Sequence, residues 1–271
     1  GLLPIVGVSG TSFVMLLIIC AILEKNIYIK TVVPILFTGL LLFGPGHYQK
    51  ISEENSDLTV TVVQPANLGL EGLIELTNQA DSNIVVWPEA SAWYSGNAFS
   101  TDKRIIGGFF RREESKTFTA VIDASNGEGY NKHNLVPFGE FQPFGDLLIG
   151  INSFFNIPNS RISRGAFVQD KLNWSGLVCW ELVFNNTFIE RVKGTEFIIH
   201  VSNDSWYGSS MPAQHLKHAR ARSVESNKWV VRSTTDGLSQ IISPQNEQSS
   251  KLLNRKEYGS ITHTIKTNTD D

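Results

Sequence analysis

Apolar residues are concentrated in the first part of the chain, where residues 1–23 carry no charged side chain. The charged side chains within residues 1–47 are Glu24, Lys25 and Lys30. A run of about 20 apolar residues is long enough to cross the hydrocarbon core of a bilayer as a helix. Because a second apolar run follows at 31–46, the pattern predicts a transmembrane helical hairpin over 1–47. Buried core helices are the alternative; a cleaved signal peptide fits less well, since no basic segment precedes the first run.

The loop charges predict how this hairpin is oriented. The short connection between the two apolar runs carries Lys25 and Lys30, whereas residues 47–57 combine Lys50 with three acidic side chains. The positive-inside rule places the short connection in the cytoplasm and everything after residue 47 on the outer side of the membrane. The chain begins with Gly1 rather than Met, and we expect its true N-terminus to lie upstream.

After the hairpin, short apolar runs alternate with amphipathic segments, which is typical of an α/β domain with a buried sheet of mixed direction. Strand composition occurs at 58–64, 83–87, 105–110, 118–122, 176–179, 196–201, 229–233, 239–242 and 260–265. Helical spacing occurs at 70–79, 182–192 and 212–227. The predicted organisation is a hairpin at 1–47, a linker at 48–57, a domain at 58–266 and a truncated tail at 267–271.

Composition narrows the function classes. The chain has 271 residues, of which 41% are hydrophobic and 18% charged, with a net charge of −3. It is too apolar for a disordered chain, and without a basic surface nucleic acid is not expected as a partner. Two cysteines cannot form a disulfide framework. His215 and His218 have no cysteine or carboxylate nearby to complete a zinc site, so no metal is expected.

Charged residues stand at the end of one predicted strand and on either side of an apolar loop. Glu89 follows an apolar strand and Pro88, which places it at a carboxyl edge of the sheet, where α/β proteins hold ligands. Such a carboxylate can have a raised pKa and act as a base; a solvated loop glutamate is the simpler interpretation. Lys132 and Glu140 flank an apolar loop. A fixed ammonium there can stabilise an oxyanion, and a surface ion pair is the alternative.

Cys179 ends an apolar strand and precedes a predicted helix. The helix N-terminus is expected to favour the thiolate, and the backbone N–H of Trp180 could receive an oxyanion. Most buried cysteines, in contrast, are inert small apolar residues.

The segment 202–208 follows another strand and suits a binding loop, with Asn203 and Trp206 as its candidate residues. The next helix opens near His215, and Arg222 on that helix is expected on a solvated or ion-paired face.

Together these segments resemble a known family. Glu89, Lys132 and Cys179 each follow a strand, in an order similar to the Glu–Lys–Cys triad of the nitrilase, or carbon-nitrogen hydrolase, superfamily. A closer resemblance is to the apolipoprotein N-acyltransferases, bacterial membrane enzymes that add the third acyl chain to lipoproteins. The motifs that carry it are WPEA at 87–90, YNKHNLVPFGEF at 130–141, SNDSWYG at 202–208, the 214–222 helix and 232–237. The resemblance covers residues 58–247 and implies a nitrilase-like α-β-β-α sandwich with a catalytic domain at 58–266.

The resemblance also implies roles for the candidate residues. Cys179 is expected to be the nucleophile, Glu89 the base that takes its proton and Lys132 the stabiliser of the tetrahedral oxyanion. Glu140 is expected to orient Lys132 or the base, and Glu181 to support the loop after the nucleophile. The remaining supporting residues are Trp180, Asn203, Trp206 and His215.

The implied reaction has two steps and needs no cofactor. Cys179 takes an acyl chain from a phospholipid as a thioester, and the α-amine of the diacylglyceryl-cysteine of an apolipoprotein then receives that chain. The implied location is the bacterial inner membrane, with the catalytic domain on the periplasmic side.

The sequence also departs from the family pattern. Trp180 stands where tyrosine is usual, the segment 64–72 lacks an expected tryptophan-bearing loop, and Asp236 stands where asparagine is common. The chain looks like a fragment without most of the membrane domain. A membrane-tethered nitrilase-type amidase with water as second substrate is the alternative function, and a non-catalytic scaffold is a further one.

Overall fold

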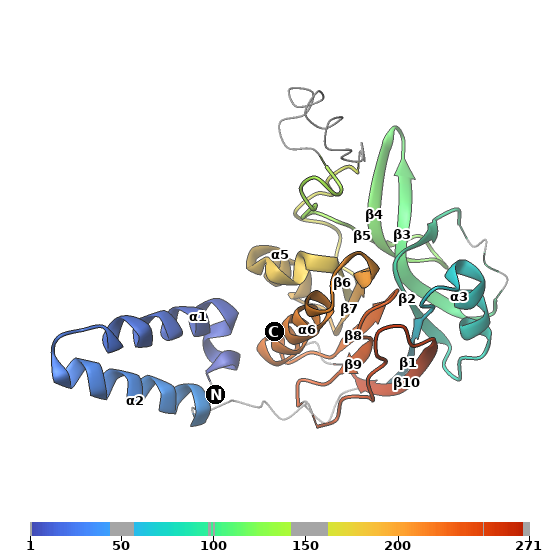
Figure 1. The fold of residues 1–271 in the computed structure, drawn as a ribbon. Helices are drawn as coiled ribbons and strands as arrows, with labels where there is room; N and C mark the ends of the chain where they lie inside the picture. The colour runs from blue at the N-terminus through green and yellow to red at the C-terminus, as the bar shows by residue number, and fades with distance from the viewer. Residues whose placement is uncertain are drawn as a thin grey trace.

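The computed structural model describes residues 2–43, 57–96, 99, 101–141, 162–245 and 247–267. In this part of the chain, a pair of N-terminal helices projects from a body of two β-sheets with helices on the outside (Figure 1). The expected linker at 48–57 and tail at 267–271 fall almost entirely outside the described residues.

The projecting pair consists of α1 (Leu3–Ile22) and α2 (Ile27–Phe43). α1 has a mean hydropathy of 2.5 and is the one helix among the described residues that is long and apolar enough to cross a membrane; α2 is a shorter apolar helix. Their surface is largely exposed, since Val14 and Ala21 are the buried residues of α1 and α2 has none. The predicted helical hairpin is confirmed, although α2 begins before the apolar run at 31–46.

α1 bends at Gly7, where it meets the body of the protein. Gly7 has φ 65° and ψ −176°, which L side chains rarely adopt, and a Cβ atom there would collide with the Glu225 carboxylate of α6 (Ser210–Ser226). The Val8 amide donates a hydrogen bond to the same carboxylate at 3.3 Å, and the Asn185 side chain donates one to the Ser9 hydroxyl. After this bend, α1 runs away from the body (Figure 1).

The body contains a six-stranded and a four-stranded sheet. The first has the order β10 (Gly259–Lys266), β1 (Asp57–Gln64), β2 (Ile84–Trp93), β3 (Arg104–Glu113), β4 (Lys116–Asp123), β5 (Gly129–Asn131). The second has the order β6 (Trp174–Val178), β7 (Phe197–Ser202), β8 (Val230–Thr234), β9 (Gln240–Ile242). The pairs β1–β2, β2–β3, β6–β7 and β7–β8 are parallel. The sequence pattern predicts these strands except β5, which has only three residues, and it predicts their mixed direction, but not their division between two sheets.

Three apolar layers hold the body together. Fully buried side chains such as Val62 and Ile199 fill the space between the sheets. α3 (Gly69–Asn78) packs on the outside of the first sheet through Leu73, and α5 (Asn185–Val192) and α6 pack on the second. The implied α-β-β-α sandwich is therefore confirmed.

The main departure from the predicted elements follows β6. Instead of a helix over 182–192, a 3-10 turn, η2 (Cys179–Val183), follows the strand, and α5 begins at Asn185. The turn arises because Cys179 adopts a left-handed conformation, with φ 54°. The backbone N–H of Val178, the last residue of β6, donates to the Glu181 side chain within this turn.

Candidate active site

Glu89 is placed by a break in strand pairing. β2 pairs regularly with β3 up to Trp87 and resumes only at Ala92, because Pro88 has no N–H to donate and Ala90 has a positive φ of 56°. Such a bulge re-aims a side chain. The Glu89 side chain is accordingly buried, with 8% exposure, which excludes the solvated loop glutamate.

Gly108 on β3 leaves room for this bulge, which predicts an effect on stability. A Cβ atom at Gly108 would lie 2.6 Å from the Pro88 carbonyl oxygen and 2.9 Å from the Glu89 amide nitrogen, both of them backbone atoms. We expect Gly108→Ala to destabilise the full chain by about 1–3 kcal/mol, as overpacking usually does, measured as a lower midpoint of thermal unfolding. The matched control is Gly208→Ala, since no atom lies within 4 Å of a Cβ there. Equal midpoints for the two variants would contradict this account.

Lys132, directly after β5, lies between two carboxylates and is 1% exposed. Its Nζ donates to Glu89 Oε1 at 3.2 Å and to Glu140 Oε1 at 2.8 Å. Burial alone would lower the pKa of the ammonium, but the charges of Glu89, Cys179 and Glu140 outweigh burial and raise it. Lys132 is therefore a fixed buried cation, and the alternative of a surface ion pair is wrong.

The Glu89 carboxyl has a raised pKa. Burial raises the pKa of Glu89 more than the Lys132 ammonium lowers it, and the Glu140 charge adds to the rise. One ammonium balances one carboxylate, and the closer partner of Lys132 is Glu140, whose other oxygen accepts the Val136 N–H at 2.8 Å. A carboxylate with a raised pKa is suited to accept a proton near neutral pH.

Cys179 directly follows β6 in a strained turn and is buried, with 4% exposure. Glu181 holds this turn. One of its carboxylate oxygens accepts the backbone N–H that precedes Cys179 at 3.0 Å, and the other accepts the N–H groups of His133 at 2.8 Å and Asn134 at 3.1 Å. Since these two residues directly follow Lys132, Glu181 fixes the cysteine turn and the lysine loop relative to each other.

The thiol of Cys179 is held in its protonated form. Burial raises its pKa to about 12, the Glu89 charge adds to the rise, and the Lys132 ammonium and Ser202 side chain lower it less. The expectation that a helix N-terminus favours the thiolate is therefore wrong, because a short turn follows the cysteine and a carboxylate lies near it. Burial and the neighbouring Cys179 raise the pKa of the Tyr207 hydroxyl as well. Reaction of this thiol at neutral pH requires a base.

This electrostatic arrangement predicts an unusual effect of removing Glu89. In Glu89→Gln the charge that raises the pKa of Cys179 is lost while the Lys132 ammonium remains, so the pKa of the thiol should fall. We expect faster alkylation of Cys179 by iodoacetamide at pH 8 than in the unmodified chain, and a lower midpoint in the pH profile, measured by mass spectrometry of the Cys179 peptide. Glu113→Gln, which removes an exposed carboxylate paired with Arg111, should leave the profile unchanged. An unchanged or raised midpoint in Glu89→Gln would contradict the assigned cause.

The loop after β7 contacts the cluster formed by Glu89, Lys132, Glu140 and Cys179. The backbone N–H of Asn203 donates to Glu89 Oε2 at 2.9 Å, while its side chain accepts from Ser205 and caps η3 (Asp204–Trp206). Asn203 thus contacts Glu89 through its backbone N–H and not through its side chain.

Asp204 is the fully buried anchor of this loop. It accepts hydrogen bonds from Ser202 Oγ at 2.6 Å, from His215 Nδ1 at 2.9 Å and from Arg232 at 2.7 Å. Burial would raise the pKa of Asp204, but His215 and Arg232 outweigh it and hold that pKa well below its usual range. His215 therefore supports the loop through Asp204 and has no hydrogen bond to Glu89, Lys132 or Cys179 among the described residues.

A second chain of contacts runs behind the cysteine turn. Arg232 donates to His200 Nδ1 at 2.6 Å, and His200 Nε2 lies 2.8 Å from the Cys179 carbonyl oxygen. Because a guanidinium only donates, Nδ1 must accept, and the ring hydrogen on Nε2 bonds the carbonyl. Burial and the Arg232 charge hold the pKa of His200 well below its ordinary value, so the ring is neutral. The strained turn is thus fixed from behind.

The remaining predicted residues take different places. Trp180 donates from Nε1 to the Asn134 carbonyl at 2.8 Å, whereas Trp206 is 81% exposed at the surface. Arg222 pairs with Glu225 at 2.5 Å and is 1% exposed, so of the two expectations for it, a solvated or an ion-paired face, the ion pair is the one observed. No group of three or more His, Cys, Asp or Glu side chains that could hold a metal occurs within the described part of the chain.

Sequence reasoning assigned no individual role to five residues around the site, although the motifs at 202–208 and 232–237 contain all of them except His200: Ser202, Tyr207, Asp204, His200 and Arg232. A signal for the last two was present, because each is a titratable side chain inside an apolar strand, and such residues are rarely buried without a partner.

The sequence also matches a known protein family. The profile of the carbon-nitrogen hydrolase family matches residues 104–269, more than half of the chain. The chain belongs to the carbon-nitrogen hydrolase family. The matched range contains Lys132 and Cys179, whereas Glu89 lies before it.

Two relatives of the chain share a more specific description within this family. A protein of Vibrio parahaemolyticus described as apolipoprotein N-acyltransferase is 38% identical over 191 residues, which cover 59% of this chain and 38% of the relative. One of Photobacterium profundum with the same description is 30% identical over 287 residues, covering 89% and 56%. The chain thus spans 38% to 56% of the length of these relatives.

Solved structures agree on the fold. A carbon-nitrogen hydrolase superfamily protein of Xanthomonas campestris superposes with a TM-score of 0.55 at 17% identity, covering 78% of this chain and 91% of that one. The nitrilase-like sandwich implied by the motifs is the fold observed.

Proposed function

We propose that this protein transfers a fatty acyl chain from a phospholipid to the N-terminal α-amine of diacylglyceryl-cysteine in apolipoproteins. The observation that carries the proposal is the buried cluster in which Lys132 bonds both Glu89 and Glu140 beside the protonated thiol of Cys179. The relatives described as apolipoprotein N-acyltransferases support the choice of substrates. The exposed apolar hairpin supports a membrane location.

In the first half-reaction, Glu89 accepts the thiol proton as Cys179 Sγ attacks the carbonyl carbon of a phospholipid ester. The carbonyl oxygen becomes an oxyanion, which the Lys132 ammonium stabilises in a low-dielectric site. The C–O ester bond then breaks, and the lysophospholipid oxygen leaves with the proton held by Glu89. The acyl chain remains on Sγ as a thioester.

In the second half-reaction, the α-amine of the lipoprotein cysteine attacks the thioester carbonyl. Glu89 takes a proton from the amine and returns it to the departing Cys179 sulfur, so that an amide forms and the thiol is restored. Glu140 holds Lys132 in place, and Glu181 holds the cysteine turn against the lysine loop. No step requires a cofactor.

The proposal includes the arrangement in the membrane. The hairpin at 1–47 would span the inner membrane, with Lys25 and Lys30 on the cytoplasmic side and the catalytic domain at 58–266 in the periplasm. The thioester must be shielded from water for transfer to compete with hydrolysis, and acyl chains of bound lipid would provide that shield.

The test is the acyl-enzyme itself. The full chain is incubated in mixed micelles with a phospholipid of defined acyl chains, and the Cys179 peptide is analysed by mass spectrometry. We expect a fatty-acyl adduct that is absent in Cys179→Ala and that is discharged on addition of a diacylated lipopeptide, which gains the chain. A folded protein without the adduct would overturn the proposal, and an adduct discharged equally fast by water alone would reduce it to a hydrolase.

A further inference from the structure

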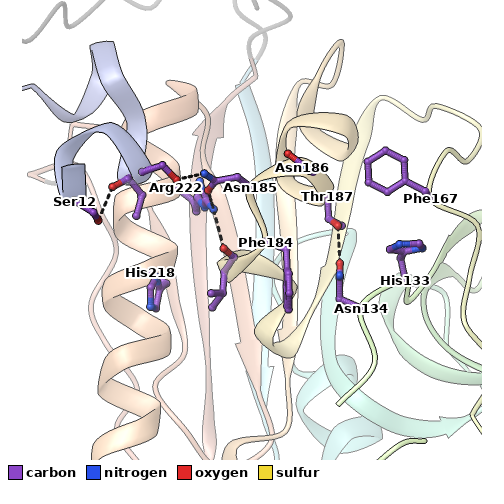
Figure 2. A pocket seen from close by; sticks show the side chains of 13 residues that line it. Ser12, His133, Asn134, Phe167, Phe184, Asn185, Asn186, Thr187, His218 and Arg222 are labelled. Atoms are coloured by element: carbon purple, nitrogen blue, oxygen red, sulfur yellow. Dashed lines mark hydrogen bonds between the residues drawn. The ribbon is translucent and has the colours of Figure 1, made fainter. Parts of the chain in front are cut away.

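A cavity of about 620 Å³ lies where the hairpin meets the body, and neither Glu89, Lys132 nor Cys179 lines it. Figure 2 shows Ser12 of α1 on one side, His218, Arg222 and Asn185 in the middle, and Asn134, His133 and Phe167 on the other. The cavity is therefore walled by both the apolar hairpin and the polar body.

The position of the cavity along α1 sets its depth in a bilayer. Val8, Ser9 and Ser12 line it, and they occupy the first turns after the bend at Gly7. At a rise of 1.5 Å per residue, Ser12 lies only about 8 Å beyond Gly7. The rest of α1 leads away from the body, so in a membrane-spanning hairpin this cavity lies at the level of the lipid headgroups.

The cavity wall has no uncompensated fixed charge. Arg222 is its one guanidinium among the described residues, and it donates to the Glu225 carboxylate at 2.5 Å, to the Leu182 carbonyl at 2.8 Å and to Asn185 Oδ1 at 2.6 Å. Burial and the Arg222 charge lower the pKa of His218, which leaves that ring neutral. No carboxylate belongs to the described lining. The wall therefore favours a ligand without net charge.

Several polar side chains of the cavity wall are available for hydrogen bonds to a ligand. The side chains of Asn186 and His218 have no hydrogen-bond partner within the described ranges, and His133 uses only Nδ1, toward the Gly165 carbonyl at 2.8 Å. The N–H groups of an amide can donate to a phosphate, and the negative end of its carbonyl dipole attracts a quaternary ammonium, so both charges of a zwitterionic headgroup find a counterpart. Next to the cavity, Phe13 and Leu16 of α1 are 61% and 56% exposed.

We propose that this cavity is a second lipid site, separate from the thiol, that binds the zwitterionic headgroup of a phospholipid whose acyl chains lie along α1. The inference rests on the hairpin being in the membrane, as proposed above, but not on acyl transfer. The same headgroup chemistry also occurs in soluble glycerophosphodiesters, which the experiment distinguishes.

The experiment uses the full chain carrying Cys179→Ala, which cannot form a thioester, in nanodiscs of phosphatidylcholine. A trace of phosphatidylcholine with a photoreactive diazirine in the headgroup is activated, and the cross-linked peptides are mapped. We expect cross-links on the peptides that contain Ser12 and Asn186, and at least a tenfold loss in Asn186→Trp, which fills the cavity. Ile189→Trp is the matched control on the same helix, since Ile189 is 61% exposed and does not line the cavity.

Three outcomes would overturn the proposal. The first is equal cross-linking in Asn186→Trp and Ile189→Trp, with Ser12→Trp as a second filling variant if the former does not fold. The second is equal competition by anionic phosphatidylglycerol, which would contradict the charge argument. The third is equal competition by free glycerophosphocholine, which would assign the cavity to a soluble ligand. Failure of acyl transfer would instead appear as an absent Cys179 adduct in the unmodified chain and would leave these cross-links unaffected.

Discussion

Lys132→Met is expected to slow formation of the Cys179 acyl adduct by about 10³-fold or more, the combined scale of losing an oxyanion stabiliser and an effective base. Without the ammonium, the buried Glu89 and the partly buried Glu140 face each other uncompensated, and the pKa of Glu89 rises further because Lys132 is the main group that lowers it. Glu89 would then hold a proton near pH 7. The pKa of the Cys179 thiol rises as well, since Lys132 also lowers that value.

The measurement is the rate of adduct formation on the Cys179 peptide, followed by mass spectrometry in phospholipid micelles. Lys171→Met is the matched control, because Lys171 forms an exposed ion pair with Glu190, and such pairs contribute little. Thermal unfolding of the same samples separates loss of chemistry from loss of fold. A folded Lys132→Met variant that forms the adduct within tenfold of the unmodified rate would show that the buried ammonium is not needed.

How far the sequence alone leads can be judged from particular elements. Most strands are predictable because each is a short apolar run between polar segments; β5, with the sequence GYN, is the exception. The position of Cys179 directly after a strand follows from the same pattern, whereas Glu89 lies at a bulge inside β2 and Lys132 follows the unpredicted β5. Their convergence does not follow from the pattern, because it requires β2 and β5 of one sheet to face β6 of the other. That information came from the family resemblance.

The chemistry of the thiol was less predictable than its position. A sequence shows that a helix follows Cys179, but it does not show the left-handed turn, the burial or the nearby Glu89 charge, and these reverse the sign of the expected pKa shift. His200 and Arg232 were missed for a related reason. Each looks like an irregularity in an apolar strand until the fold shows that they bond each other.

Arg232→Met is expected to destabilise the protein by about 3–5 kcal/mol, the usual loss when one partner of a buried ion pair is removed. Asp204 and Arg232 are both fully buried, so the substitution leaves the Asp204 carboxylate without its cation and His200 Nδ1 without its donor. At roughly 2–4 °C per kcal/mol for a domain of this size, the midpoint of thermal unfolding of the full chain in micelles should fall by roughly 6–20 °C. Adduct formation should also slow, since the neutral His200 then no longer fixes the Cys179 carbonyl.

The control for Arg232→Met is Arg255→Met, because Arg255 pairs with Asp236 at 3.4 Å near the surface and its removal should change stability by less than about 1 kcal/mol. Asp204→Asn breaks the buried pair from the other side and should destabilise as well. If the double variant unfolds at a higher temperature than the sum of the two single losses predicts, the pair acts as a coupled unit. If Arg232→Met instead unfolds within 1 °C of Arg255→Met, the loop after β7 is held by other contacts. The backbone N–H of Asn203 would then reach Glu89 independently of the buried pair.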